Sequence, residues 1–176
     1  MVDLAPADID ERALDAGWTA EGLGPDAIAL RLAEAKALAV APAHPGRLVI
    51  GADQTLALGS RRFSKPADMA AARRQLIALR GQVHHLHADL AVVRDGTVIA
   101  ATVSTTAMHV RPFSEAFLDA YLEAMGTRVL ESVGCYQVEG LGAQLFERID
   151  GDWFTVLGMP LLSLLDVLRR EGAMTA

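Results

Sequence analysis

The chain has 176 residues, of which 52% are hydrophobic and 22% are charged, and its formal net charge is −6. This length allows one sizeable hydrophobic core and is short for two domains. The negative charge argues against general affinity for nucleic acids or for anionic membrane surfaces, although a local group of Lys and Arg can still bind a small anion.

Cysteine content and apolar patterning indicate the compartment. Cys135 is the single cysteine, which excludes an intrachain disulfide and a zinc site built from several thiolates. No apolar run approaches the length of a membrane span, and residues 1–6 lack the basic and apolar regions of a signal peptide. We therefore expect a cytoplasmic protein.

The first part of the chain predicts one helix and one strand. Residues 1–24 are acidic and interrupted by Gly and Pro, so we expect them to be irregular. Apolar residues at helical spacing predict a helix over 26–40. A strand is expected over 47–58, because its run 48–50 is continuously apolar, which is typical of a strand covered on both faces.

A loop to Lys65 and a second helix follow. Apolar residues at helical spacing mark this helix over 69–79, and Gly81 suits its C-terminal cap. Residues 86–94 and 97–110 have the pattern of two strands, joined by a hairpin signal at Asp95-Gly96.

The last part of the chain predicts two helices and one strand. Ser114 is placed to cap a helix that carries Phe117, Tyr121 and Met125. The remaining elements are a glycine-rich loop, a strand and a closing helix, over 134–142, 143–149 and 160–170. Since strands and helices alternate, the sequence predicts one mixed α/β sheet flanked by helices.

Asp53 is the first candidate for chemistry. It follows an apolar strand run, and ligands of open α/β sheets bind beyond the carboxyl ends of strands. A carboxylate there can hold a divalent metal or polarise a water molecule. It can equally cap a turn, and its position alone leaves both interpretations open.

Two lysines and a histidine group are less specific. Lys65 could bind a phosphate, but an ordinary solvated lysine explains it as well. Lys36 lies in an apolar helix and either extends to solvent or into a cleft. The histidines at 84, 85 and 87 lack a nearby carboxylate to complete a metal site, and their alternation along a strand favours a structural role.

The stretch 134–142 contains three glycines, which permit close approach of a ligand to the backbone. Gln137 and Glu139 could accept hydrogen bonds from the edge of a nucleotide base. A glycine-rich bend between strands is the alternative. Cys135 has no evident paired base, so a small buried side chain is its expected role.

Taken together, these segments resemble the Maf family of nucleotide pyrophosphatases, which have an ITPase-like fold. The matching segments, in chain order, are DIDE (8–11), LAEAKA (32–37), VIGADQ (49–54), KPAD (65–68), LRGQVH (79–84), GCYQVEG (134–140), LFERIDG (145–151) and VLGMPL (156–161). Each segment is weak alone, but their common order is highly specific. The resemblance implies a single Maf-like domain over 1–176, with a mixed, curved sheet flanked by helices.

The resemblance also implies a reaction. Family members are hydrolases that cleave a nucleoside triphosphate between the α and β phosphates, with Mg²⁺ or Mn²⁺ as cofactor. Asp53 matches the catalytic proton acceptor and a metal-site residue, and Glu11 matches a metal-site carboxylate. Lys36 and Lys65 match lysines that contact phosphates.

Two further positions indicate a branch of the family. Pyrimidine-cleaving members have Thr after the catalytic Asp and Gln before the late glycine, whereas this chain has Gln54 and Glu139. This pair is similar to the 7-methyl-GTP pyrophosphatase branch. Glu139 could accept from guanine N1–H and the N2 amine, and the positive charge of methylated guanine favours an anion nearby. A pyrimidine-type pyrophosphatase acting on dTTP or UTP is the alternative.

One segment of the family pattern has no counterpart here. The family opens with a strand and a Ser-x-Ser-Pro-Arg-Arg turn whose arginines bind the triphosphate, at a helix N-terminus that suits anions. We therefore expect that the first strand and helix, roughly 25–30 residues, are missing, either because the start of the sequence was assigned too late or because the protein is truncated. Arg61, Arg62, Arg73 and Arg74 do not lie in a matching context.

The expected partners follow from the same argument. A small nucleotide is the expected substrate, and no nucleic acid or membrane partner is expected. The family often forms homodimers, so a homodimer is compatible with the resemblance. The absent arginine turn also keeps open a catalytically weak, nucleotide-binding regulator linked to cell division.

Overall fold

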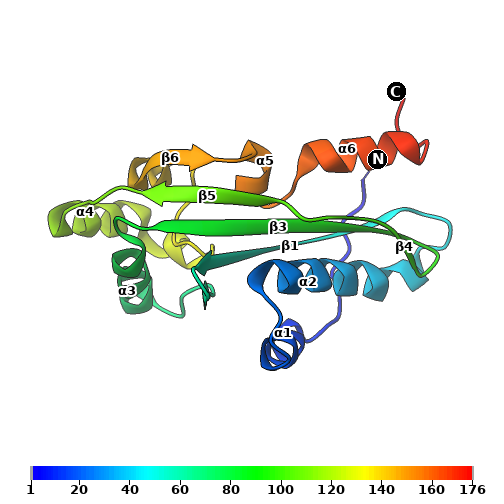
Figure 1. Cartoon of the computed structure of the whole chain (residues 1–176), viewed down its shortest axis with the longest axis horizontal. Coiled ribbons are helices and arrows are strands. Elements are labelled where there is room, and N and C mark those ends of the chain that lie inside the picture. The colour runs from blue at the N-terminus through cyan, green and yellow to red at the C-terminus, as the bar shows by residue number, and fades with distance from the viewer. Residues whose placement is uncertain (1, 176) are drawn as a thin grey trace. The chain divides into compact units, whose positions relative to one another are not determined.

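The computed structural model describes residues 2–175. Figure 1 shows an α/β fold, which confirms the predicted class. Its α-helices are α1 (Glu11–Ala20), α2 (Pro25–Val40), α3 (Met69–Leu79), α4 (Glu115–Met125), α5 (Trp153–Val156) and α6 (Leu161–Arg170). Its strands are β1 (Val49–Leu58), β2 (Arg61–Phe63), β3 (Val83–Arg94), β4 (Thr97–Thr102), β5 (Thr105–Val110) and β6 (Phe146–Asp150). Short 3-10 helices are η1 (Ala41–Ala43), η2 (Gly126–Leu130) and η3 (Leu141–Leu145).

The strands form a curved, six-stranded sheet in the order β2-β1-β3-β5-β6, and β4 pairs with β3. Pairing is antiparallel between β1 and β2, between β3 and β4, and between β5 and β6. The predicted hairpin is confirmed: Arg94 pairs with Thr97, and Asp95 and Gly96 have φ of 50° and 77°. Positive φ at both central residues gives the tight turn the right-handed twist of its strands.

The chain folds as two compact units. The first contains the described residues up to Gln54, with His87–Ser104 and the described residues from Asp152 onward. The second contains Thr55–Leu86 and Thr105–Gly151. Strands β1 and β3 each contribute residues to both units.

In the first unit, helices cover both faces of the strands. Ala37 of α2 and Ala41 of η1 pack with Val49 and Val93. On the opposite face, the apolar side of α6 packs on alternate residues of the sheet; this cluster includes Leu48, Ile50, Leu90, Val92, Leu164 and Val167. The predicted strand with two covered faces is therefore confirmed, and Figure 1 shows α2 and α6 on either side of it.

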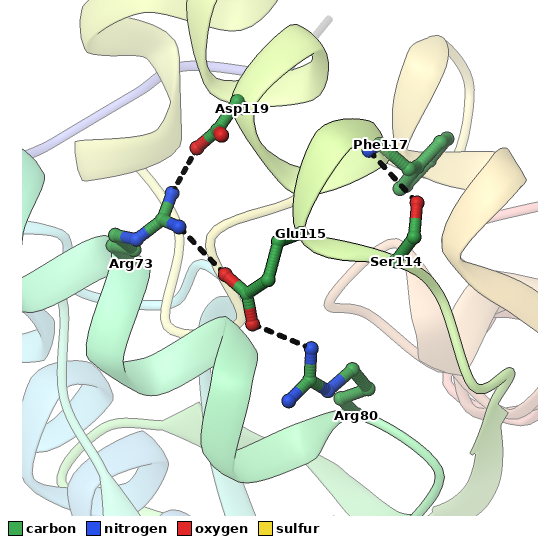
Figure 2. Close-up of polar contacts among 6 residues, drawn as sticks. All are labelled: Arg73, Arg80, Ser114, Glu115, Phe117 and Asp119. Atoms are coloured by element: carbon green, nitrogen blue, oxygen red, sulfur yellow. Dashed lines mark hydrogen bonds and ion pairs between the residues drawn. The ribbon is translucent and has the colours of Figure 1, made fainter.

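In the second unit, charged side chains join α3 to α4. Arg73 is paired with Glu115 at 2.6 Å and also with Asp119, and Arg80 is paired with Glu115 at 2.7 Å (Figure 2). Ser114 caps α4 by accepting from the backbone N–H of Phe117, as its sequence position predicts (Figure 2). Because Arg73 already has two carboxylate partners, it is not a free phosphate ligand.

Some sequence expectations were wrong in detail. Residues 1–24 contain α1, a helix with no buried residue, capped by the Asp10 carboxylate. The loop before Lys65 contains β2, and the short α5 was not predicted. The strand expected over 97–110 is two strands, because the backbone of Ser104 leaves the strand pairing. Its N–H donates to the Asp89 side chain, and its carbonyl accepts from the Ala88 N–H. The strand expected over 143–149 begins at Phe146, since η3 takes the residues before it.

Helix length also bears on membrane insertion. Among residues 2–175, none of the helices is both long enough and apolar enough to cross a membrane.

Candidate active site

Strand β1 places its side chains alternately on two faces, and this alternation builds the candidate site. Val49 packs under α2, whereas Ile50 packs on the α6 side. Side chains two residues apart share a face. Asp53 therefore faces α2, and Gln54 faces the opposite side.

Gly51 lets α2 lie close to β1. A Cβ at this position would lie 2.1 Å from the carbonyl oxygen of Ala33 and 2.9 Å from the backbone nitrogen of Ala37. Glycine is therefore required by close backbone approach and not by a turn. This close approach brings Lys36, which precedes Ala37 on α2, to Asp53, which lies two residues after Gly51 on the same face of β1.

Lys36 joins the two predicted acidic residues. Its Nζ lies 2.7 Å from Asp53 Oδ1 and 3.2 Å from Glu11 Oε2. The side chain of Asp53 is 13% exposed and that of Glu11 is 51% exposed. The structure thus brings together Glu11, Lys36 and Asp53, which lie far apart in the sequence.

The electrostatics of this triad keep Lys36 charged. Partial burial lowers the pKa of Lys36, but the hydrogen bond to Asp53 and the charges of Asp53 and Glu11 outweigh it, so the pKa is raised. Lys36 is therefore an ammonium ion at neutral pH, able to oppose phosphate charge.

The same geometry provides a test of fit for a divalent cation. Two carboxylates converge on one positively charged atom, so this position already favours a cation. Carboxylate oxygens are the ligands preferred by Mg²⁺ and Mn²⁺. Among residues 2–175, however, His, Cys, Asp and Glu form no group of three placed to hold a metal. Glu11 and Asp53 would therefore supply two carboxylate ligands to such a cation.

Gln54 is held by α5. Its Nε2 donates to the carbonyl oxygens of Thr155 at 2.9 Å and of Val156 at 3.3 Å. No sequence pattern predicts this contact, because α5 is a single turn located about a hundred residues further along the chain.

Lys65 and Glu139 belong to the second unit. Lys65 is exposed between β2 and α3, where Asp68 caps the helix by accepting from the Ala71 N–H. Glu139 is exposed at the end of a stretch whose preceding residues are largely buried. Both side chains are therefore accessible to a ligand.

The glycine-rich stretch has a buried structural part. Cys135 is fully buried, and burial raises the pKa of its thiol to about 12, so it does not react as a thiolate. The Tyr136 hydroxyl lies 2.6 Å from His84 Nε2 inside the second unit. Burial lowers the pKa of His84 to about 3, so the ring is neutral, and its contact with Tyr136 is structural.

Asp89 is an acidic residue that the sequence did not single out. It is fully buried, its Oδ1 accepts from the Ser104 N–H at 3.0 Å, and its Oδ2 has no partner within residues 2–175. Burial, with the charges of Asp26 and Asp53, raises its pKa to about 6 despite the bond from Ser104. An acid inside the apolar run of β3 was the signal that could have revealed it.

The chain is similar in sequence to the proteins of one family. The family model described as Maf-like protein matches residues 1–171. A Mesorhizobium japonicum protein named 7-methyl-GTP pyrophosphatase is 50% identical over 98% of this chain and 86% of its own length. A Rhodopseudomonas palustris protein named nucleoside triphosphate pyrophosphatase is 53% identical over 97% and 83%. A Brucella abortus protein named 7-methyl-GTP pyrophosphatase is 50% identical over 95% and 84%.

The class defined by this fold and site is therefore an α/β protein with an acid–lysine–acid triad beside the middle of β1, and not beyond a strand end as the sequence suggested. More specifically, the chain belongs to the Maf family.

Proposed function

We propose that the protein is a hydrolase that cleaves nucleoside triphosphates between the α and β phosphates, releasing a monophosphate and pyrophosphate. The observation that carries this proposal is the convergence of Glu11 and Asp53 on Lys36 in a chain of the Maf family. Relatives named as pyrophosphatases at 50% identity or more support the same reaction class.

The triad suggests how the chain's own groups contribute. Asp53, as a carboxylate, accepts a proton from the attacking water, whose oxygen adds to one phosphorus of the α–β bridge. The bridging oxygen leaves with the other phosphorus, and two phosphate products result. Lys36 orients Asp53 through the 2.7 Å contact and opposes negative charge on the triphosphate. A bound Mg²⁺ or Mn²⁺, held by Glu11 and Asp53, would neutralise phosphate charge.

We further propose that 7-methyl-GTP is the preferred substrate. Glu139 carries an exposed carboxylate that can accept from guanine N1–H and the N2 amine. Its negative charge complements the positive charge of 7-methylguanine. Several similar relatives are named 7-methyl-GTP pyrophosphatase, which supports this substrate. Lys65, exposed in the second unit, is our candidate for a phosphate contact.

The compartment belongs to the same proposal. Cys135 is free and buried, as expected of a thiol in a reducing cytoplasm, and we assign the protein to that compartment. The homodimer stays a prediction.

A panel of substrates tests this function. Pyrophosphate release should be measured for 7-methyl-GTP, GTP, ATP, dTTP and UTP, each with Mg²⁺ and with Mn²⁺. We expect release of pyrophosphate, fastest from 7-methyl-GTP. Preference for dTTP or UTP would overturn the substrate assignment, and release of orthophosphate, or no release from any nucleotide, would overturn the reaction.

A further inference from the structure

The amide group of Gln54 has a fixed orientation. Its Nε2 donates to two carbonyl oxygens, those of Thr155 and Val156, so both amide hydrogens are used. Since both partners are acceptors, the nitrogen end of the amide is identified by its contacts. Oε1 has no hydrogen-bond partner within residues 2–175, and it is the group that remains for a ligand.

The space beside this oxygen is left open by a glycine. Gly158 has a φ of 100°, which L side chains rarely adopt. A Cβ added there would come within 3.9 Å of Gln54 Oε1. Gly158 also donates its N–H to the Thr155 carbonyl at 3.1 Å, so this carbonyl accepts two hydrogen bonds.

The turn that provides these carbonyls is itself anchored by a hydroxyl. The Thr155 hydroxyl donates to Asp152 Oδ2 at 3.1 Å, and Asp152 also accepts from the Thr155 N–H at 2.9 Å. The Ser104 hydroxyl lies 2.6 Å from Thr155 Oγ1. Because the Thr155 hydroxyl donates its single hydrogen to Asp152, the Ser104 hydroxyl must be the donor to Thr155 Oγ1.

Ser104 is in turn fixed to β3. Its N–H donates to Asp89 at 3.0 Å, and its carbonyl accepts from the Ala88 N–H at 2.9 Å. Thr155 is fully buried, and all of these residues lie in the first unit. Hydrogen bonds therefore link β3 to Ser104, the Ser104 hydroxyl to the Thr155 hydroxyl, and the Thr155 carbonyl to the amide of Gln54.

We infer that Thr155 is a positioning residue for substrate selection. The hydroxyl of Ser104 holds Thr155, and Thr155 fixes the α5 carbonyl oxygens that accept both hydrogens of the Gln54 amide. Gln54 therefore presents only an acceptor to a ligand. A free glutamine amide can both donate and accept, and it discriminates poorly between complementary edges. A glutamine restricted to accepting requires an N–H on the base. Guanine meets it with two adjacent donors, N1–H and the N2 amine, whereas the single ring N–H of uracil lies between two carbonyl oxygens that repel an acceptor.

This inference rests on the proposed function, in which Gln54 contacts the nucleotide base. Positioning and base contact can nevertheless be separated. The first is a property of the free protein, visible in the Gln54 side-chain amide. The second is visible only in nucleotide kinetics.

The test uses Thr155→Val, which keeps the shape of the side chain and removes its hydroxyl, with Thr97→Val as control because Thr97 is exposed on β4 of the same unit. Hydrogen exchange of the Gln54 side-chain amide is measured by NMR, its signals assigned by their loss in Gln54→Met. Gln137 serves as the solvent-exposed reference, because its side-chain amide makes only one long contact, 3.4 Å, to exposed Glu131. Kinetics of 7-methyl-GTP and UTP are measured on the same samples.

We expect slower amide exchange at Gln54 than at Gln137, and loss of that protection in Thr155→Val. KM for 7-methyl-GTP should rise about fivefold, the equivalent of one hydrogen bond, while kcat changes little. The control should behave as the original chain. Ser104→Ala removes the other hydroxyl of the Ser104–Thr155 contact. This variant provides the test if Thr155→Val does not fold.

Each opposite result has its own meaning. If the Gln54 amide exchanges as fast as that of Gln137, or keeps its protection in both hydroxyl variants, the positioning role of Thr155 is wrong. If protection is lost but KM and the preference for 7-methyl-GTP over UTP stay unchanged, the base contact assigned to Gln54 is wrong.

Discussion

Two carboxyl groups at the α2-facing side of the sheet show how single residues are held. Asp53 has a cationic partner, Lys36, at 2.7 Å. Asp89 is fully buried, and the charge of Asp53 acts on it. A buried carboxylate without an ionic partner costs stability, whereas a paired one retains its charge at smaller cost.

The cost at Asp89 depends on pH. The folded-state pKa is raised from 3.8 to about 6, so the folded protein holds the proton more tightly than the unfolded chain. The contribution of Asp89 to stability is full below pH 3.8 and is lost as the pH rises through about 6. Near pH 7.5 the loss is at most about 3 kcal/mol, since one pKa unit corresponds to ~1.4 kcal/mol.

Asp89→Asn should therefore stabilise the protein at neutral pH. The amide oxygen can still accept from the Ser104 N–H, and no ionisation occurs. Urea unfolding at pH 4 and pH 7.5 measures the effect as the difference between the variant and the original chain. We expect the unfolding free energy of the variant, relative to that of the original chain, to rise by about 1–3 kcal/mol from pH 4 to pH 7.5. A variant less stable than the original at pH 7.5 would show that the carboxylate has a partner in the folded protein.

At the scale of elements, the closeness of α2 and β1 holds the triad together. Gly51→Ala would place a Cβ 2.1 Å from the Ala33 carbonyl oxygen, and backbone atoms cannot move aside as a flexible side chain does. We expect a loss of roughly 1–3 kcal/mol or more in unfolding free energy, as for other overpacked sites. Displacement of α2 should also separate Lys36 from Asp53 and lower activity.

A matched control is available in α1. Gly17 has nothing within 4 Å of an added Cβ and lies inside the helix, so Gly17→Ala should leave stability unchanged or raise it by up to ~1 kcal/mol. Thermal unfolding of the two variants, measured side by side, separates close approach from the general effect of adding a methyl group. Equal stability of the two would contradict the close packing of α2 on β1.

The elements that the sequence predicted are those with a clear apolar pattern. Helix α2 was visible from the helical spacing of its apolar residues, and strand β1 from its continuous apolar run. Helix α1 has only two large apolar residues at helical spacing, Leu14 and Trp18, and this pair with the Asp10 cap was too weak a signal. β2 and α5 span only three and four residues, which is too short for periodicity to appear.

The candidate site was predicted as residues and not as contacts. Glu11, Lys36 and Asp53 were expected from the resemblance, and the structure brings them together. Sequence alone could not show that Lys36 would lie between the two acids, because this depends on the approach of α2 permitted by Gly51. Nor could it show the anchoring of Gln54, which involves a distant single turn.

For the whole molecule, the central claim is that Asp53 is the proton acceptor of a triphosphate-cleaving site. The initial rate of pyrophosphate release from 7-methyl-GTP should be measured for the original chain and for Asp53→Asn, with calorimetric nucleotide binding on the same samples. The amide keeps the size of the side chain but cannot take the proton. We expect the rate to fall by roughly 10²–10⁴-fold, as for loss of a general base, with binding largely kept. An unchanged rate in Asp53→Asn would contradict the account.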